Sequence, residues 1–198
     1  SLLVIDHHKT AQADLADLHY CAFDMTKSGA GLTWDLLMPG EPRPWLIDYI
    51  EDRDLWRHAL PDSEAVNAAL RSYPLDFALW DDFEQRDISS FVAEGQAIRR
   101  REQQIIDMHV KNAREVTLGG HRVRAVNATV LFSEIAGELA NGQPFGACWF
   151  ERQDGKRVWS LRSAPDGVDV SVIAKAYGGG GHVHAAGFED HLYNAAAD

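Results

Sequence analysis

The pattern of hydrophobic and polar positions divides the chain into two differently patterned halves with one long helix between them. A continuous apolar run at residues 2–5 predicts a buried parallel strand that feeds a loop. A second short strand is expected at residues 19–23. Helices are then predicted over residues 28–37, 44–56, 61–71 and 74–83, with Ser28 capping the first and Pro or Gly marking most of the ends.

The middle of the chain predicts a single long amphipathic helix over residues 87–114. Its apolar positions recur at helical spacing, and Gly95 is the one glycine within it. Such a helix has about 26 residues and is about 40 Å long. Its place between two differently patterned halves indicates a connector between domains.

The second half predicts hairpins and short helices. The expected strands are residues 115–118, 122–126, 145–151 and 158–162, with turns at Gly119-Gly120 and Asp154-Gly155. The expected helices are residues 133–140 and 168–177, and the second runs into four glycines. The fold class is therefore α/β, with an N-terminal parallel-sheet lobe joined by the long helix to a smaller α+β domain. We expect domains at 1–86 and 115–198, with the connector at 87–114.

Composition adds an acidic, globular character. The 198 residues carry a net charge of −11 and are 45% hydrophobic and 25% charged, which is not the composition of a disordered chain. A sequence pI near 5.2 argues against a broad surface for duplex nucleic acid, although divalent cations could still recruit a phosphorylated substrate. No apolar stretch approaches the roughly 18 residues of a membrane helix, so no membrane partner is expected. The two separated cysteines favour reduced thiols in a cytoplasmic protein.

The first candidate site is Asp6-His7-His8, directly after the first predicted strand. Open α/β sheets bind ligands just beyond the carboxyl ends of their strands, where adjacent residues can converge. Neutral imidazoles ligate divalent metals, and a carboxylate can ligate beside them or orient the ring. The alternative is a solvated surface loop with a capping aspartate.

The second candidate site is the acidic stretch Glu51 to Asp54 at the end of a predicted helix. Paired carboxylates can bind hard divalent cations. Asp52 and Asp54 cannot share one helical face, so at most one of them should point at a given metal unless the helix ends there. The alternative is a solvated helix end.

The third candidate site is the glycine-rich segment 178–187. Successive glycine N–H groups can curl into a concave nest around an anion, and His182 could donate to the same phosphate. A flexible linker is the alternative. Arg162, on the strand before it, could fork onto a phosphate or lie on the surface as an ordinary arginine.

These segments, in this order, resemble the DHH phosphoesterase family with its C-terminal DHH-associated domain. The matching segments are 4–8, 28–31 at the start of a helix, 51–56 and 178–187. The resemblance implies a two-lobed hydrolase with a divalent-metal site in a cleft between domains, holding Mn²⁺ or else Mg²⁺ or Co²⁺. It covers nearly the whole chain.

The resemblance also implies roles for particular residues. His7 would be a metal ligand, His8 would face the substrate phosphate, and Asp6 would support the site as a catalytic residue. Asp52 would be the later acidic ligand, with Asp54 the less favoured choice. Substrate binding would fall to Arg162, Gly179, Gly180, Gly181, His182, Ala185, Ala186 and Gly187.

The implied function is hydrolysis of phosphodiester or phosphomonoester bonds in short oligonucleotides or nucleotides by a metal-bound hydroxide. The family carries an acidic first-strand motif ahead of the histidine pair, and this sequence has five residues before Asp6. We therefore expect a fragment of a longer protein that is inactive by itself. The alternatives are a non-catalytic nucleotide-binding or nucleic-acid-binding module, an exopolyphosphatase or pyrophosphatase, and an acidic interaction protein. A homodimer is left open.

Overall fold

A computed structural model describes residues 2–191, apart from the side chain of His191, and has the α/β fold that the sequence predicts. The chain separates into two compact units, Ser1–Arg101 and Glu102–Asp198. The long helix α6, Ile88–Asn112, runs across the boundary between them and confirms the helix predicted over 87–114. None of the helices within residues 2–191 combines the length and the apolar character needed to cross a membrane.

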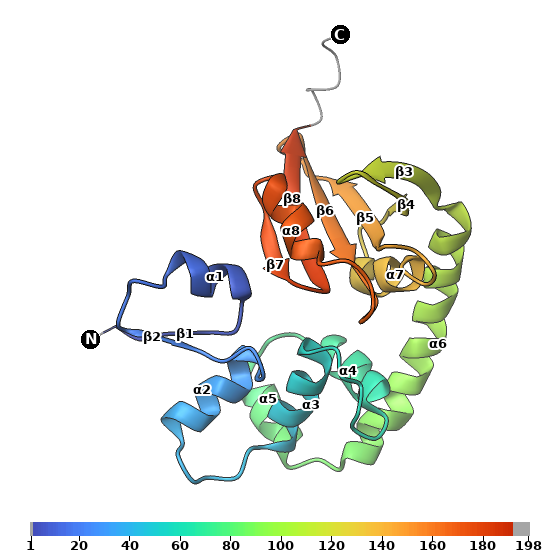
Figure 1. The fold of residues 1–198 in the computed structure, drawn as a ribbon. Helices are drawn as coiled ribbons and strands as arrows, with labels where there is room; N and C mark the ends of the chain where they lie inside the picture. The colour runs from blue at the N-terminus through green and yellow to red at the C-terminus, as the bar shows by residue number, and fades with distance from the viewer. Residues whose placement is uncertain (1, 192–198) are drawn as a thin grey trace. The chain divides into compact units, whose positions relative to one another are not determined.

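The first unit begins with two parallel strands. Strand β1, Val4–Asp6, pairs with β2, Cys21–Phe23, so that Asp6 lies opposite Phe23 (Figure 1). A short helix, α1 (Lys9–Asp14), follows β1 and was not predicted. Strand β1 was predicted to be buried but is only partly buried, as β2 is, because the sheet that the described residues form here has two strands and each keeps an open edge.

Four helices follow β2 in the described part of the first unit: α2 Gly29–Leu37, α3 Trp45–Asp54, α4 Ser63–Arg71 and α5 Phe77–Glu84. Helices α3, α4 and α5 pack around one core with the start of α6, whereas α2 contacts α3 and β1. Val66 and Leu70 of α4 pack in this core against Phe83 and Phe91, each at most 1% exposed. Helix α3 reaches this core through Leu46 and Tyr49 while its last turn carries the acidic stretch. The core therefore fixes where those carboxylates lie.

The second unit is a mixed sheet of six strands in the order β3-β4-β5-β6-β8-β7 (Figure 1). Its strands are β3 Arg114–Leu118, β4 His121–Asn127, β5 Gly146–Glu151, β6 Lys156–Arg162, β7 Gly180–His182 and β8 Ala185–His191. The β4–β5 pair is parallel and the other pairs are antiparallel.

Helices cover both faces of this sheet. Helix α8, Val170–Ala176, packs on the face that carries Leu161 and Phe188. Helix α7, Phe132–Leu139, packs on the opposite face with Ile106 of α6 and Cys148. Side chains that alternate along β6 therefore point to different helices.

Cys148 is a free thiol, and burial raises its pKa to about 12.

Candidate metal centre

The end of β1 holds both histidines through one carboxylate. Asp6 Oδ1 accepts a hydrogen bond from the His7 backbone N–H (2.7 Å) and lies 2.7 Å from His8 Nδ1. Burial raises the pKa of Asp6, but the contacts from His8 and from the His7 amide outweigh it and leave the pKa below its usual value. Asp6 is thus an anion that orients the residues next to it.

His7 points inward and meets an acidic side chain from α3. The imidazole is 6% exposed, and its Nε2 lies 3.3 Å from Asp54 Oδ2, on a carboxylate that is about half exposed. Two ligand atoms that each lie about 2.1 Å from one ion, at angles near 90–110°, are about 3.0–3.4 Å apart. The separation therefore fits an imidazole and a carboxylate that share one divalent cation.

The carboxylate beside His7 belongs to Asp54 and not to Asp52, which the sequence favoured. Asp52 is 4% exposed, and its oxygens accept hydrogen bonds from the amides of Ala59 (2.9 Å) and Leu60 (3.4 Å). Burial raises the pKa of Asp52. Hydrogen bonds from the Ser63 side chain and from these two amides lower it by more, so the pKa lies below its usual value. A buried carboxylate needs hydrogen-bond donors, and those of Asp52 bind the same carboxylate oxygens that a metal would use. The prediction that only one of the two aspartates can face the site agrees with this arrangement.

Helix α3 places a second carboxylate, that of Glu51, on the same side as Asp54. Glu51 and Asp54 are three residues apart and so lie on one side of α3, whereas Asp52 lies on another. In the structure Glu51 faces the start of α2, which lies next to His7. That start is close enough that a Cβ on Gly29 would lie 4.0 Å from His7 Cδ2.

Glu51 fastens the N-terminus of α2 to α3. One of its oxygens accepts hydrogen bonds from the Ser28 backbone N–H (2.8 Å) and hydroxyl (3.2 Å), while Ser28 Oγ accepts from the Gly31 amide (3.0 Å). The predicted Ser28 cap is confirmed. Burial raises the pKa of Glu51, and the Ser28 amide and Arg43 more than offset this, so the carboxyl is ionised at neutral pH.

Glycine is needed at Gly31 for this approach. A Cβ there would lie 2.1 Å from the Glu51 carboxylate. Arg43 closes the other side: its Nη1 donates to Glu51 (3.1 Å) and its Nε and Nη2 bind the carboxylate of Asp35. Arg43 therefore bridges the carboxylates of Glu51 and Asp35.

In the second unit, three of the predicted substrate-binding residues lie in one row across three strands. Ala185 of β8 is directly opposite Arg162 of β6 on one side and His182 of β7 on the other. Directly paired residues project to the same face of a sheet. Arg162 Nη2 donates to Ser133 Oγ at 2.7 Å, near the start of α7, so this row lies on the α7 face. The methyl group of Ala185 separates two basic side chains.

The glycine-rich segment is a strand and not the nest that was predicted. Gly180 and Gly181 pair with Gly187 and Ala186 in an antiparallel ladder, and the amides of Gly178 and Gly179 donate to carbonyl oxygens of α8. A Cβ on Gly179 would lie 2.1 Å from the Gly187 carbonyl oxygen, and one on Gly187 would lie 2.6 Å from the Trp159 carbonyl oxygen. These glycines are therefore explained by close backbone packing.

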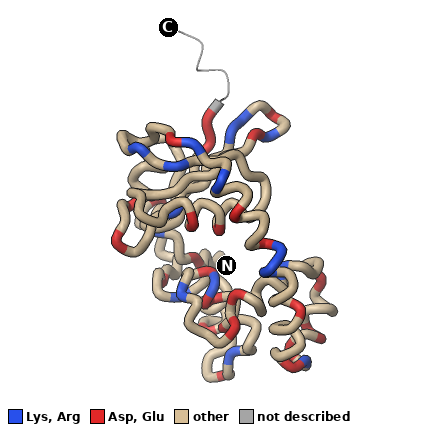
Figure 2. Tube along the Cα trace, turned by 90° about the vertical axis from the view of Figure 1, so that its right-hand side faces the viewer, with Lys and Arg blue, Asp and Glu red and all other residues tan. Residues whose placement is uncertain are grey.

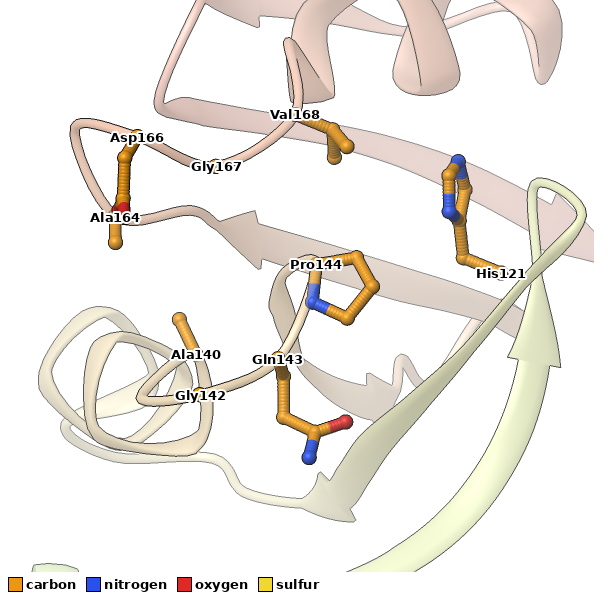
Figure 3. A pocket seen from close by; sticks show the side chains of 9 residues that line it. All are labelled: His121, Ala140, Gly142, Gln143, Pro144, Ala164, Asp166, Gly167 and Val168. Atoms are coloured by element: carbon orange, nitrogen blue, oxygen red, sulfur yellow. The ribbon is translucent and has the colours of Figure 1, made fainter.

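The second unit also has a surface pocket of about 570 Å³ away from the predicted residues (Figure 3). It lies between the loop that carries Gln143 and Pro144 and the loop that carries Ala164 and Asp166. Its lining residues are His121, Ala140, Gly142, Gln143, Pro144, Ala164, Asp166, Gly167 and Val168. None of the predicted substrate-binding residues is among them.

No family model matches the chain. It is 31% identical over 198 residues to the uncharacterized protein R106 of Acanthamoeba polyphaga mimivirus, covering 94% of this chain and 47% of that protein. It is 32% identical over 114 residues to the oligoribonuclease NrnB of Bacillus subtilis, covering 57% of this chain and 26% of that protein. The chain thus spans about half the length of the first relative and about a quarter of the second.

Solved structures give two further likenesses. An uncharacterized protein from Helicobacter pylori G27 is 14% identical with a TM-score of 0.34, covering 98% of this chain and 70% of that one. The pGpG-specific phosphodiesterase PggH from Vibrio cholerae is 15% identical with a TM-score of 0.49, covering 98% of this chain and 75% of that one. Of the two sequence relatives, one is thus a protein named for a ribonuclease activity.

Proposed function

We propose that this chain carries the metal-binding and substrate-binding parts of a phosphodiesterase that hydrolyses short oligonucleotides or nucleotides. The observation that carries the proposal is the buried His7 with Asp54 3.3 Å from its Nε2, at the carboxyl end of a parallel strand. The similarity to a protein named as an oligoribonuclease supports the choice of substrate.

The proposed metal is Mn²⁺, with Mg²⁺ or Co²⁺ as substitutes, held by His7 and Asp54. A bound divalent cation would supply positive charge against the negative charge that develops on the phosphoryl group. Asp52 has a different proposed role. It holds the loop that follows α3 and so keeps Asp54 in place.

His8 and Asp6 are proposed to act together on the substrate phosphate. Asp6 contacts Nδ1 of His8 and so leaves Nε2 as the ring nitrogen that can meet another group. Nε2 of His8 would then face a phosphate oxygen of the substrate. His8 is about half exposed, as a residue that contacts substrate must be.

The second unit is proposed to bind a further phosphate or the nucleotide end with Arg162 and His182. Their shared row with Ala185 supports this, because the small side chain leaves room between two basic ones. Gly179, Gly180, Gly181, Ala186 and Gly187 would contribute by letting the strands pack closely.

The test is Mn²⁺-dependent release of mononucleotides from a short RNA by the natural protein that contains this sequence. We expect His7→Ala and Asp54→Asn to lower kcat by at least about 100-fold, while Asp48→Asn, an exposed change on the same helix, leaves it unchanged. Nucleotide binding with no turnover under any of the three metals would support the non-catalytic binding module instead.

A further inference from the structure

We infer that Trp56 is a stacking platform for a nucleobase of the substrate. This inference rests on the proposed function, because it assigns the base-binding group beside the same metal centre. The segment 51–56 was singled out in the sequence for its acidic residues, and neither the metal ligands nor the hydrogen-bond networks above use the indole of Trp56.

Trp56 is placed by a tightly held loop. Its amide donates to the Arg53 carbonyl oxygen (2.9 Å), and the Arg57 amide donates to that of Asp52 (2.8 Å). The Asp52 carboxylate binds the other end of the loop at Ala59 and Leu60. The loop is therefore closed on both sides of the indole.

The backbone of this loop is strained. Trp56 has φ +55° and His58 has φ +48°, a left-handed conformation that is rare and costly for bulky residues. Asp54 is the last residue of α3, and the chain turns sharply just after it. Trp56 therefore follows the end of the helix in a left-handed backbone conformation.

The indole is exposed where a tryptophan would otherwise be buried. Trp56 is 48% exposed and contacts the ring of His58 edge-on, with centroids 4.8 Å apart. An edge-on partner orients an aromatic ring without covering both of its faces. A purely structural tryptophan would bury most of its large apolar surface, so its exposure here favours a ligand with a flat apolar face.

The position of Trp56 fits a nucleobase attached to a phosphate at the metal centre. Trp56 is two positions after Asp54 in the chain, so their Cα atoms are at most about 7 Å apart. On its other side, Arg57 contacts Glu51 (3.5 Å) and donates to the Thr26 carbonyl oxygen, which ties the loop to the segment before α2. A nucleotide whose phosphate lies at His7 and Asp54 would have its base within reach of the indole.

Stacking on an aromatic side chain is tolerant of sequence, because every base has a π-face. The proposed ligand class is therefore any short nucleotide, with no preference among bases from Trp56 itself. A sugar phosphate without a base would bind without help from Trp56.

The test measures equilibrium binding of a phosphorothioate RNA dinucleotide and of ribose 5-phosphate by calorimetry in Mn²⁺. The protein variants are wild type, Trp56→Ala, Trp56→Phe and Phe77→Ala. Phe77 is a matched control, because it is an aromatic residue of the same unit that is 93% exposed. Trp56→Ala should weaken binding of the dinucleotide by about tenfold or more. The affinities for ribose 5-phosphate and for Mn²⁺ should be unchanged. Trp56→Phe should keep most of the affinity, and Phe77→Ala all of it.

A second measurement reads the indole directly and does not depend on the alanine variant folding. The dinucleotide should quench wild-type tryptophan fluorescence more than it quenches Trp56→Phe, and ribose 5-phosphate should quench neither. Equal dinucleotide affinity in wild type and Trp56→Ala, with Mn²⁺ still bound, overturns the stacking inference and leaves the proposed function standing. A wild-type protein that binds Mn²⁺ but no dinucleotide overturns both.

Discussion

Each carboxylate at the end of α3 has a different set of partners, and this decides what each can do. Glu51 accepts hydrogen bonds from Ser28 and Arg43, and Asp52 accepts them from the loop amides of Ala59 and Leu60. Asp54 remains about half exposed beside His7. Because a buried carboxylate needs donors, the two buried acids are structural, and the exposed one can bind a cation.

Ser28→Ala should lower the free energy of unfolding by about 1–2 kcal/mol. The hydroxyl is the N-cap of α2 and is buried at 1% exposure, so its loss leaves the Gly31 amide without its acceptor. Urea unfolding at neutral pH measures the change. Ser90→Ala, an exposed serine on α6, should change stability by less than about 0.5 kcal/mol, and an equal loss in both variants would contradict the capping role.

Acid should destabilise the first unit through Glu51 and Asp52. Both carboxyls have pKa values lowered in the folded protein, from 4.5 and 3.8, so their contribution is complete above the unfolded values. It is lost as the pH falls below about 4.5 and then through the lower folded pKa values. Urea unfolding from pH 6 to pH 3 should show a smaller loss of stability for Asp52→Asn than for wild type. The same slope in both would show that Asp52 binds no extra protons on unfolding.

At the scale of elements, the edge of the sheet in the second unit depends on close backbone approach. Gly179→Ala should cost about 3 kcal/mol or more, because its Cβ would meet the backbone of β8. Gly178→Ala is the matched control. Gly178 has φ +82° with nothing within 4 Å of a Cβ, so that variant should lose only about 1–2 kcal/mol from backbone strain. Thermal unfolding distinguishes the two, and equal losses would mean that packing against β8 is not the reason for the glycine.

Most helices and strands could be predicted because Pro, Gly and capping residues mark where they end. The helices α2 and α6 have the predicted course to within a few residues. Helix α1 was missed because it is six residues long, too short to show a period, and its N-cap His8 makes no side-chain capping hydrogen bond. Strand β7 was missed because a run of glycines carries no alternation of apolar and polar residues.

The candidate site was predicted in its composition and less well in its detail. Asp6 and His7 are in contact at the end of β1, where the sequence predicted the site. The choice between Asp52 and Asp54 depends on the loop at Ala59 and Leu60, whose hydrogen bonds involve backbone amides that every residue type has. Sequence pattern cannot identify such donors, and so it cannot show which carboxylate they occupy.

At the scale of the whole molecule, the charge is acidic but mixed. Figure 2 shows Lys and Arg positions interspersed with Asp and Glu positions along the trace. Several arginines are paired with carboxylates, as Arg43 is with Asp35 and Arg99 with Glu64. The net charge of −11 repels a polyanionic ligand, and a divalent metal would supply attraction at the site.

Binding of a short RNA should accordingly depend on the metal. We expect a fluorescein-labelled phosphorothioate dinucleotide to bind at least about tenfold more weakly in EDTA than in Mn²⁺, because the protein repels it without the cation. Fluorescence anisotropy measures both affinities. Equal affinity in EDTA would show that basic side chains such as Arg162 hold the phosphates by themselves.

The most direct test of the metal centre is calorimetric titration of the protein with Mn²⁺, comparing wild type, Asp54→Asn and Asp48→Asn. Asp48 is a carboxylate of the same helix that is also about half exposed, so its variant controls for the loss of one charge. The His7–Asp54 assignment predicts that one site is present in wild type and Asp48→Asn and is at least about tenfold weaker in Asp54→Asn. Mn²⁺ affinity that is unchanged in Asp54→Asn would contradict the assignment.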